Sequence, residues 1–263
     1  MTQAEPRTKA TFTAPLRHFG RRALDVLLPP QCLSCGTLVE EQGALCLDCW
    51  QDVTFISQPH CAICGLPFEF AAQGNDYSDG HLCGSCVRKR PVFERARAVL
   101  AYDDASSPFI LTFKHADRTE AASAFARWMA RAGADVLENA DLITPVPLHW
   151  SRLFKRRYNQ AALLGQRLSQ ISAVPAIPDL LVRKRATPSQ GRFSPSARKR
   201  NVRGAFQVRE KYIPNISGKR VVLVDDVLTT GATASAVTRA LLGAGAEAVD
   251  VLTLGRVLRP FPL

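Results

Sequence analysis

The chain has 263 residues, of which 46% are hydrophobic, so it can build one large domain or two small ones around a real core. No apolar run approaches the roughly 20 residues that cross a bilayer, and Asp25 interrupts the short apolar stretch Ala23–Leu28 near the N-terminus. These features argue against a membrane-spanning or secreted protein, and we expect a soluble, cytoplasmic chain.

The net charge of +11 is concentrated in one part of the chain. Between Leu181 and Arg220, 12 lysines and arginines accompany a single acid, Glu210, so the rest of the chain is close to neutral. A local basic segment of this kind favours a polyanionic ligand: pyrophosphate, nucleic acid or both.

Residues 1–28 form a polar, basic N-terminal segment, and most of it is expected to be disordered. Leu16–Leu28 has the pattern of a short basic amphipathic helix, which Pro29 and Pro30 would end. We expect this helix to pack against the next module rather than to lie on a membrane.

Eight cysteines follow as four CxxC pairs, with none left over. A CxxC turn presents two thiolates to one metal ion, and two such turns complete the shell of a structural zinc site. Without a signal peptide the pattern favours metal over disulfides, and no thioredoxin-like strand precedes the pairs to favour a redox role. Sequential and interleaved pairing both remain open. The predicted ligands of the two zinc ions are Cys32, Cys35, Cys46, Cys49, Cys61, Cys64, Cys83 and Cys86.

The next hundred residues alternate between strand and helix patterns. We predict strands at Ala96–Tyr102 and Ala140–Val146, and helices at Phe109–Ala132 and Tyr158–Ile171. This alternation is typical of a parallel sheet with flanking helices. Between the second strand and the second helix, residues 148–157 form a basic loop whose cations suit a pyrophosphate.

Residues 180–206 carry the densest part of the basic segment, with proline, serine and glycine between the cations. This composition predicts a mobile lid that closes over a reacting sugar and excludes water. Arg183, Lys184 and Arg185 would then neutralise a leaving group. The same segment would also suit single-stranded nucleic acid, for which Phe193 and Phe206 are available for stacking.

The most informative stretch begins with four aliphatic residues, Val221–Val224, which predict a strand buried on both faces. Asp225 and Asp226 come where that strand should end, and a loop containing threonines and Gly231 leads into a helix at Ala234–Leu242. Adjacent carboxylates can hold two neighbouring hydroxyls of a ribose, and the free N–H groups at a helix start favour a phosphate. A last strand is expected at Ala248–Gly255. Neither a GxGxxG nor a GxxxxGK[ST] nucleotide motif is present.

This stretch resembles the phosphoribosyl pyrophosphate motif of type I phosphoribosyltransferases. The resemblance implies that Asp225 and Asp226 bind the ribose and that the following loop binds its 5-phosphate, while the turn after the preceding strand holds the pyrophosphate with magnesium. The implied substrate-binding residues are Val227, Leu228, Thr229, Thr230, Gly231, Ala232 and Thr233 in the loop and Val146, Pro147, Leu148, Arg156, Arg157, Asn159 and Gln160 around the turn.

Four segments together resemble the ComF competence family. They are the cysteine module, the run 157–160, the segment 187–206 and the acid-pair motif, and they span residues 29–256. The resemblance implies a double zinc ribbon fused to a type I phosphoribosyltransferase fold, and a role in DNA uptake or in the use of external DNA. We expect a basic segment at 1–28, the ribbons at 29–90 and the α/β domain at 91–263.

Two functions follow as hypotheses. The first is a phosphoribosyltransferase whose acceptor pocket must come from elsewhere, because only nine residues follow Leu254. The second is a non-catalytic factor that binds single-stranded DNA through the basic 181–220 segment and the zinc ribbons, or an adaptor for proteins of the DNA-uptake machinery.

Overall fold

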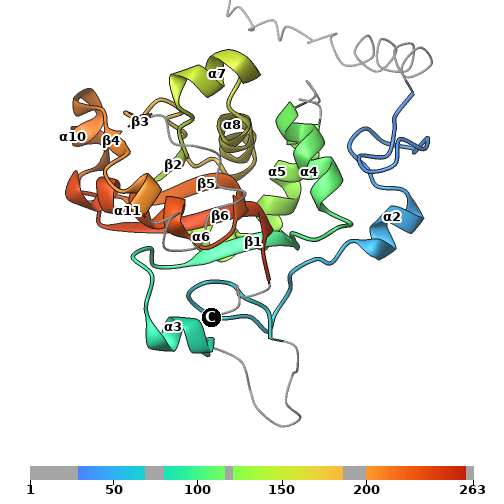
Figure 1. The fold of residues 1–263 in the computed structure, drawn as a ribbon, viewed down its shortest axis with the longest axis horizontal. Coiled ribbons are helices and arrows are strands. Elements are labelled where there is room, and N and C mark those ends of the chain that lie inside the picture. Colours follow the sequence, from blue (N-terminus) through green and yellow to red (C-terminus); the bar gives the residue numbers. More distant parts are fainter. Residues whose placement is uncertain (1–28, 69–79, 116–120, 186–199, 259–263) are drawn as a thin grey trace, which may run out of the picture.

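The computed structural model describes residues 29–68, 80–115, 121–185 and 200–258. A four-stranded sheet in the order β1-β6-β5-β2 forms the centre, and every neighbouring pair in it is parallel. Helices cover its faces, and the cysteine-rich region lies along the β1 edge (Figure 1). The strands of this sheet are β1 (Ala96–Ala101), β2 (Leu142–Pro145), β5 (Arg220–Leu228) and β6 (Ala248–Arg256).

Side chains of β5 and β6 alternate between two apolar cores, as the period of a strand requires. Val222 and Val224 belong to a core built with the helices between β1 and β2 and with α8, whereas Val221 and Leu223 belong to a core built with α11. The helices are α4 (Ser107–His115), α5 (Ala121–Ala132), α6 (Ala134–Leu137), α7 (Trp150–Arg156), α8 (Gln160–Ser172), α10 (Ile213–Ile216) and α11 (Ala232–Gly243).

A smaller antiparallel sheet pairs β3 (Leu181–Arg183) with β4 (Phe206–Val208). It packs in the same core as α11, and a 3-10 turn at Glu210–Tyr212 leads from it to α10. Among the described helices, none has the length and apolar character needed to cross a membrane.

The cysteine-rich region covers the open edge of the main sheet. Residues 54–56 run antiparallel to β1: Ile56 N–H donates to Val99 O at 2.8 Å, and Ala101 N–H donates to Thr54 O at 2.9 Å. At the start of β1, Ala96 N–H donates to Ile63 O at 2.6 Å. An exposed strand edge invites association with other chains, and here the ribbon region occupies it. The short helices of this region are α2 (Leu47–Asp52) and α3 (Gly84–Arg88).

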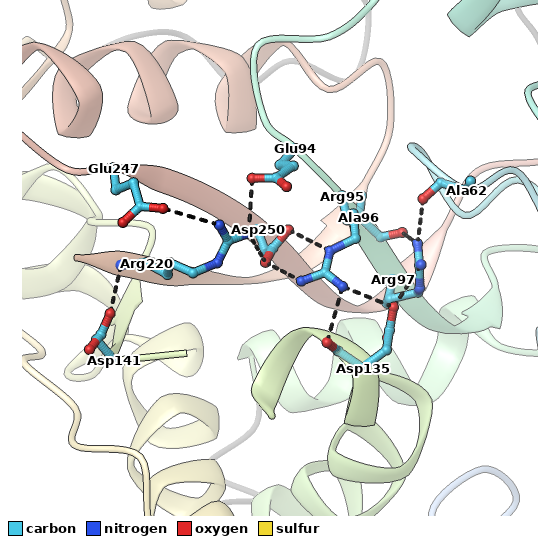
Figure 2. A network of polar contacts seen from close by, with 10 residues as sticks. All are labelled: Ala62, Glu94, Arg95, Ala96, Arg97, Asp135, Asp141, Arg220, Glu247 and Asp250. Atoms are coloured by element: carbon cyan, nitrogen blue, oxygen red, sulfur yellow. Dashed lines mark hydrogen bonds and ion pairs between the residues drawn. The ribbon is translucent and has the colours of Figure 1, made fainter. Parts of the chain in front are cut away.

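A network of ion pairs joins the amino ends of the central strands (Figure 2). Arg95 makes a two-point contact with Asp250, at 2.9 and 3.1 Å, and Arg97 pairs with Asp135 at 2.7 Å. Arg220 pairs with Glu94 at 2.9 Å. The Asp250 carboxylate raises the pKa of Arg95 through this hydrogen bond. The network ties the segment that follows the ribbons to β5, β6 and α6.

Replacing Asp250 by alanine should destabilise the chain by about 2–3 kcal/mol, just below the usual range for a broken buried ion pair, because Arg95 keeps some contact with water. Asp250 is only 3% exposed, and its loss leaves Arg95 with the longer, 3.6 Å contact to the Asp135 carboxylate. Lys219→Ala is the control: it breaks an exposed pair with Asp141 and should cost less than about 1 kcal/mol. Urea unfolding of both variants makes the comparison; equal losses would contradict it.

Several expected elements differ from the observed ones. The predicted basic loop 148–157 contains the helix α7, and β5 continues past the acid pair to Leu228. The prediction of a mobile segment at 180–206 was wrong at both of its ends, which form β3 and the start of β4. Residues 186–199 between them, with Phe193, and the N-terminal segment 1–28 lie outside the described residues.

Candidate functional site

The acid pair projects beyond its neighbour on one side of the sheet. β2 pairs with β5 only from Leu142 opposite Val221 to Pro145 opposite Val224. Asp225 and Asp226 come next on β5, so they lie past the end of β2, and both are half-buried. In a parallel sheet this carboxyl edge is where ligands bind.

The loop after the acid pair ends at the start of α11. Gly231, with φ of +69°, occupies the cap position of this helix and has no side chain with which to cap it. The first N–H groups of a helix have no intrahelical partner, so this end can accept an anion. A small cavity lies between the loop and Asp225; among its lining residues are Asp225, Thr229, Gly231 and Thr233. Val227, Leu228 and Ala232 line it too, whereas Thr230 is exposed beside it.

The predicted pyrophosphate turn lies next to the acid pair. Val146 N–H donates to Val224 O at 2.8 Å, which places the turn beside the residue before Asp225. Asn159 supports the turn: its Nδ2 donates to Val146 O at 3.0 Å, and its Oδ1 accepts from Ala161 N–H at the start of α8. The Asn159 side chain therefore braces the turn. Pro147 and Gln160 are buried and Leu148 is half-buried.

The cations of α7 lie between this turn and α8. Arg156 is the last residue of α7, and Arg157 ends the helix in the left-handed conformation, with φ of +65°. Arg157 is exposed and Arg156 is half-buried. Both therefore belong to a helix end, in place of the predicted loop.

Arg183 is buried in β3, at 7% exposure, with its guanidinium carbon 5.2 Å from the centre of the Phe206 ring. Burial lowers the pKa of Arg183 to about 10; the nearby charge of Arg152 adds to this decrease, and that of Asp225 opposes it. Arg183 therefore stays charged at neutral pH, within electrostatic range of both Asp225 and a second arginine. Crowded cations of this kind favour an anionic ligand.

The other two predicted lid residues are exposed. Arg185 donates to Arg203 O at 2.8 Å, and Lys184 N–H donates to Ala205 O at 2.9 Å. Both bonds hold the two ends of the predicted lid together.

The cysteines form two clusters of four, and the pairing is sequential. The first is Cys32, Cys35, Cys46 and Cys49; the second is Cys61, Cys64, Cys83 and Cys86. In each cluster the ligand atoms lie within 4.8 Å of one another.

The sulfur geometry fits zinc. The Cys35–Cys46 and Cys64–Cys83 sulfurs are 3.6 Å apart, which is close to the edge of a tetrahedron with bonds of about 2.3 Å. Backbone N–H groups donate to sulfur in both clusters, as Cys83 N–H does to Cys61 Sγ at 3.3 Å. Such donors stabilise thiolates around a metal.

Two features of the site region could not be found by motif. Arg256, at the end of β6, donates to the sulfur of Cys64 at 3.3 Å. Burial raises the pKa of Cys64 to about 11, and the Arg256 charge opposes this. Trp50, Phe55 and Trp128 form an aromatic cluster beside a cavity of about 730 Å3. For Arg256, the only signal in the sequence is a charged residue at the end of an apolar strand. The aromatic cluster joins segments that are far apart in sequence, so no local pattern indicates it.

The geometry and the matched families define the class: a double zinc ribbon joined to a phosphoribosyltransferase domain. The double zinc ribbon family matches residues 23–87, and the phosphoribosyl transferase domain family matches residues 159–257. The chain belongs to the competence protein F family, as the sequence resemblance predicted. The domain boundaries at 28/29 and 90/91 stay predictions.

Three relatives carry this assignment. Competence protein F of Haemophilus influenzae is 31% identical over 86% of this chain and 96% of its own length. DNA utilization protein YhgH of Escherichia coli is 37% identical over 75% of this chain and 84% of its own length. Competence protein ComFC of Bacillus subtilis is 25% identical over 83% of this chain and 87% of its own length.

Proposed function

We propose that the chain binds phosphoribosyl pyrophosphate as its magnesium complex and acts, as a phosphoribosyltransferase-like protein of the cytoplasm, in the uptake or use of external DNA. The observation that carries this proposal is one edge of the sheet. There the acid pair and an uncapped helix start lie at the two ends of one short loop, and the buried cation Arg183 is within electrostatic range of Asp225.

Each group has a role that follows from its chemistry. Asp225 and Asp226 accept hydrogen bonds from the two ribose hydroxyls, and the loop Thr229–Thr233 donates to the 5-phosphate. On this proposal Arg183, within electrostatic range of Asp225, and the turn at Val146, beside Val224, hold the pyrophosphate. When the C1–oxygen bond breaks, its electron pair leaves with the pyrophosphate, and a lone pair of the acceptor fills the position at C1. The carboxylates would stabilise the positive charge on the ring and the cations the negative charge on the leaving group.

The biological part of the proposal is tested by complementation. A strain that lacks its own competence protein F relative should regain transformation by external DNA when it carries this chain. The Asp225→Ala variant should fail to restore it at equal protein level. Full complementation by Asp225→Ala would show that the role in DNA uptake does not depend on the sugar phosphate site.

A second candidate function is the binding of single-stranded DNA, and the aromatic cluster favours it. Trp50 is 48% exposed, with its ring 4.5 Å from Phe55 and 6.3 Å from Trp128. The cavity beside them, of about 730 Å3, also has Arg131 in its lining. Aromatic faces with nearby cations are the usual means of holding unpaired bases.

The basic 181–220 segment supports this second function less well than its charge suggested. Among its described residues, Lys211 pairs with Asp179, Lys219 with Asp141, and Arg220 with Glu94. Arg183 is buried. The zinc ribbon side of the molecule is therefore the better candidate for a DNA surface.

Trp50→Ala should weaken binding of a short single-stranded oligonucleotide about 10-fold, because one stacked base is lost. The slope of log affinity against log salt concentration should be unchanged in Trp50→Ala, whereas Arg131→Gln should lower this slope by about one counterion. Trp150→Ala, on the exposed face of α7, is the matched control and should bind as the parent does. Fluorescence anisotropy at several salt concentrations gives both quantities. Equal affinities for Trp50→Ala and the parent would rule out this cavity.

A further inference from the structure

The second zinc cluster and the loop Thr229–Thr233, the proposed phosphate-binding loop, face each other across a narrow cleft of about 170 Å3. Cys64 and Cys86 line one side, and Thr230 and Gly231 line the other. Arg256 also lines this cleft. The outer side of the loop therefore lies against a zinc ribbon.

Arg256 connects the two sides. Its side chain is buried, and it donates from Nη1 to Cys64 O at 2.6 Å and from Nη2 to Cys64 Sγ at 3.3 Å. A donor that contacts a metal-ligating sulfur orients that ligand, and the metal-held ligand in turn fixes the donor. The position of Arg256 thus depends on where the second cluster holds Cys64.

The backbone of Arg256 is attached to the first part of the loop. Arg256 lies opposite Leu228 in the parallel pair of β5 and β6, and Val257 N–H donates to Leu228 O at 3.0 Å. Leu228 is buried and is followed directly by Thr229. Arg256, whose side chain binds Cys64, is therefore the strand partner of the residue that precedes the loop.

Phe93 supplies a second contact at the far end of the loop. This buried residue follows the second ribbon, and its ring lies 3.5 Å from where a Cβ on Gly231 would be. Gly231 has a φ of +69°, a backbone conformation that residues other than glycine rarely adopt. The loop thus adjoins the end of β6 at Leu228 and the Phe93 ring at Gly231.

We propose that Arg256 is a positioning residue of the sugar phosphate site, and that zinc-held Cys64 is the anchor against which it holds the phosphate-binding loop. On this account the second zinc ribbon is part of the site. The inference rests on the proposed binding of the 5-phosphate by Thr229–Thr233. Arg256 itself touches no part of the ligand.

The test compares Arg256→Gln with Arg97→Gln. Arg97 is equally buried and grips the same ribbon, by donating to Ala62 O at 3.1 Å, but it lies on β1 and pairs with Asp135 (Figure 2). Arg256→Gln should weaken the binding of phosphoribosyl pyrophosphate and the binding of ribose 5-phosphate by the same factor, about 10-fold. The factor is shared because both ligands carry the 5-phosphate. Arg97→Gln should change neither affinity by more than about 2-fold. Both variants should keep two zinc ions per chain.

Amide hydrogen exchange without any ligand gives a second readout. Residues 228–235 should exchange faster in Arg256→Gln than in Arg97→Gln or the parent. Unchanged exchange there, or an equal increase in both variants, would overturn the proposal. If the Arg256→Gln variant loses zinc, the same affinity and exchange measurements are made on Arg256→Lys, provided that it keeps both zinc ions, and the same outcomes decide the proposal. Failure of the parent to bind phosphoribosyl pyrophosphate would refute the proposed function, while the exchange comparison would still decide the role of Arg256.

Discussion

Replacing Asp225 by alanine should reduce the affinity for phosphoribosyl pyrophosphate by at least about 100-fold, because the ribose loses hydrogen bonds to a charged acceptor. Asp225 lies past the end of β2 and lines a cavity together with Thr229 and Gly231. It is only half-buried, so the fold should remain intact and the melting temperature should change little. Isothermal titration with magnesium present gives the affinity.

Glu138→Ala is the control for this variant. Glu138 is an exposed acid that follows α6, near the amino end of the sheet, and its removal should leave the affinity unchanged. Binding by Asp225→Ala as tight as that of the parent would refute the assignment of the ribose site. Equal losses in both variants would point to a general effect of charge.

Loss of the second zinc site should destabilise the chain far more than loss of the first. The four cysteines of the second cluster belong to the same apolar core as β5, β6 and α11. In the first cluster Cys35 is exposed. Because zinc contributes much of the folding free energy of a ribbon, Cys86→Ser should lower the melting temperature by more than about 10 °C.

Cys35→Ser is the matched variant, and it should lower the main melting temperature by less than half as much. Its effect should stay within the first ribbon, which contacts the opposite core through Leu33 and Val53. Calorimetry with zinc analysis of each variant makes the comparison. Equal shifts in the two variants would contradict the separate roles of the two sites.

The sequence predicted the centre of the fold because local patterns decide it. Four consecutive aliphatics in Val221–Val224 require burial on both faces, and the loop after Asp226 contains the glycine that begins α11. The CxxC spacing predicted two zinc sites for the same reason. It could not choose the pairing, because sequential and interleaved arrangements satisfy the same local turns.

The errors arose where distant residues decide the outcome. The count of charges between Leu181 and Arg220 predicted a basic segment that favours a polyanionic ligand, but it could not show that carboxylates elsewhere, such as Asp141 and Glu94, pair with part of that segment. Similarly, the contact between Arg256 and Cys64 joins residues 192 positions apart. The mobile lid was expected from composition, yet the partnership of β3 with β4 fixes its ends.

The most direct test of the account is a calorimetric titration of the zinc-loaded protein with phosphoribosyl pyrophosphate and magnesium, with ribose 5-phosphate as the comparison. We predict micromolar binding that is at least about 10-fold tighter for phosphoribosyl pyrophosphate, because the proposed site holds its pyrophosphate with Arg183 and the turn at Val146. The absence of binding by the folded, zinc-loaded chain would contradict the central claim. The aromatic cavity beside Trp50 would then become the leading candidate for function.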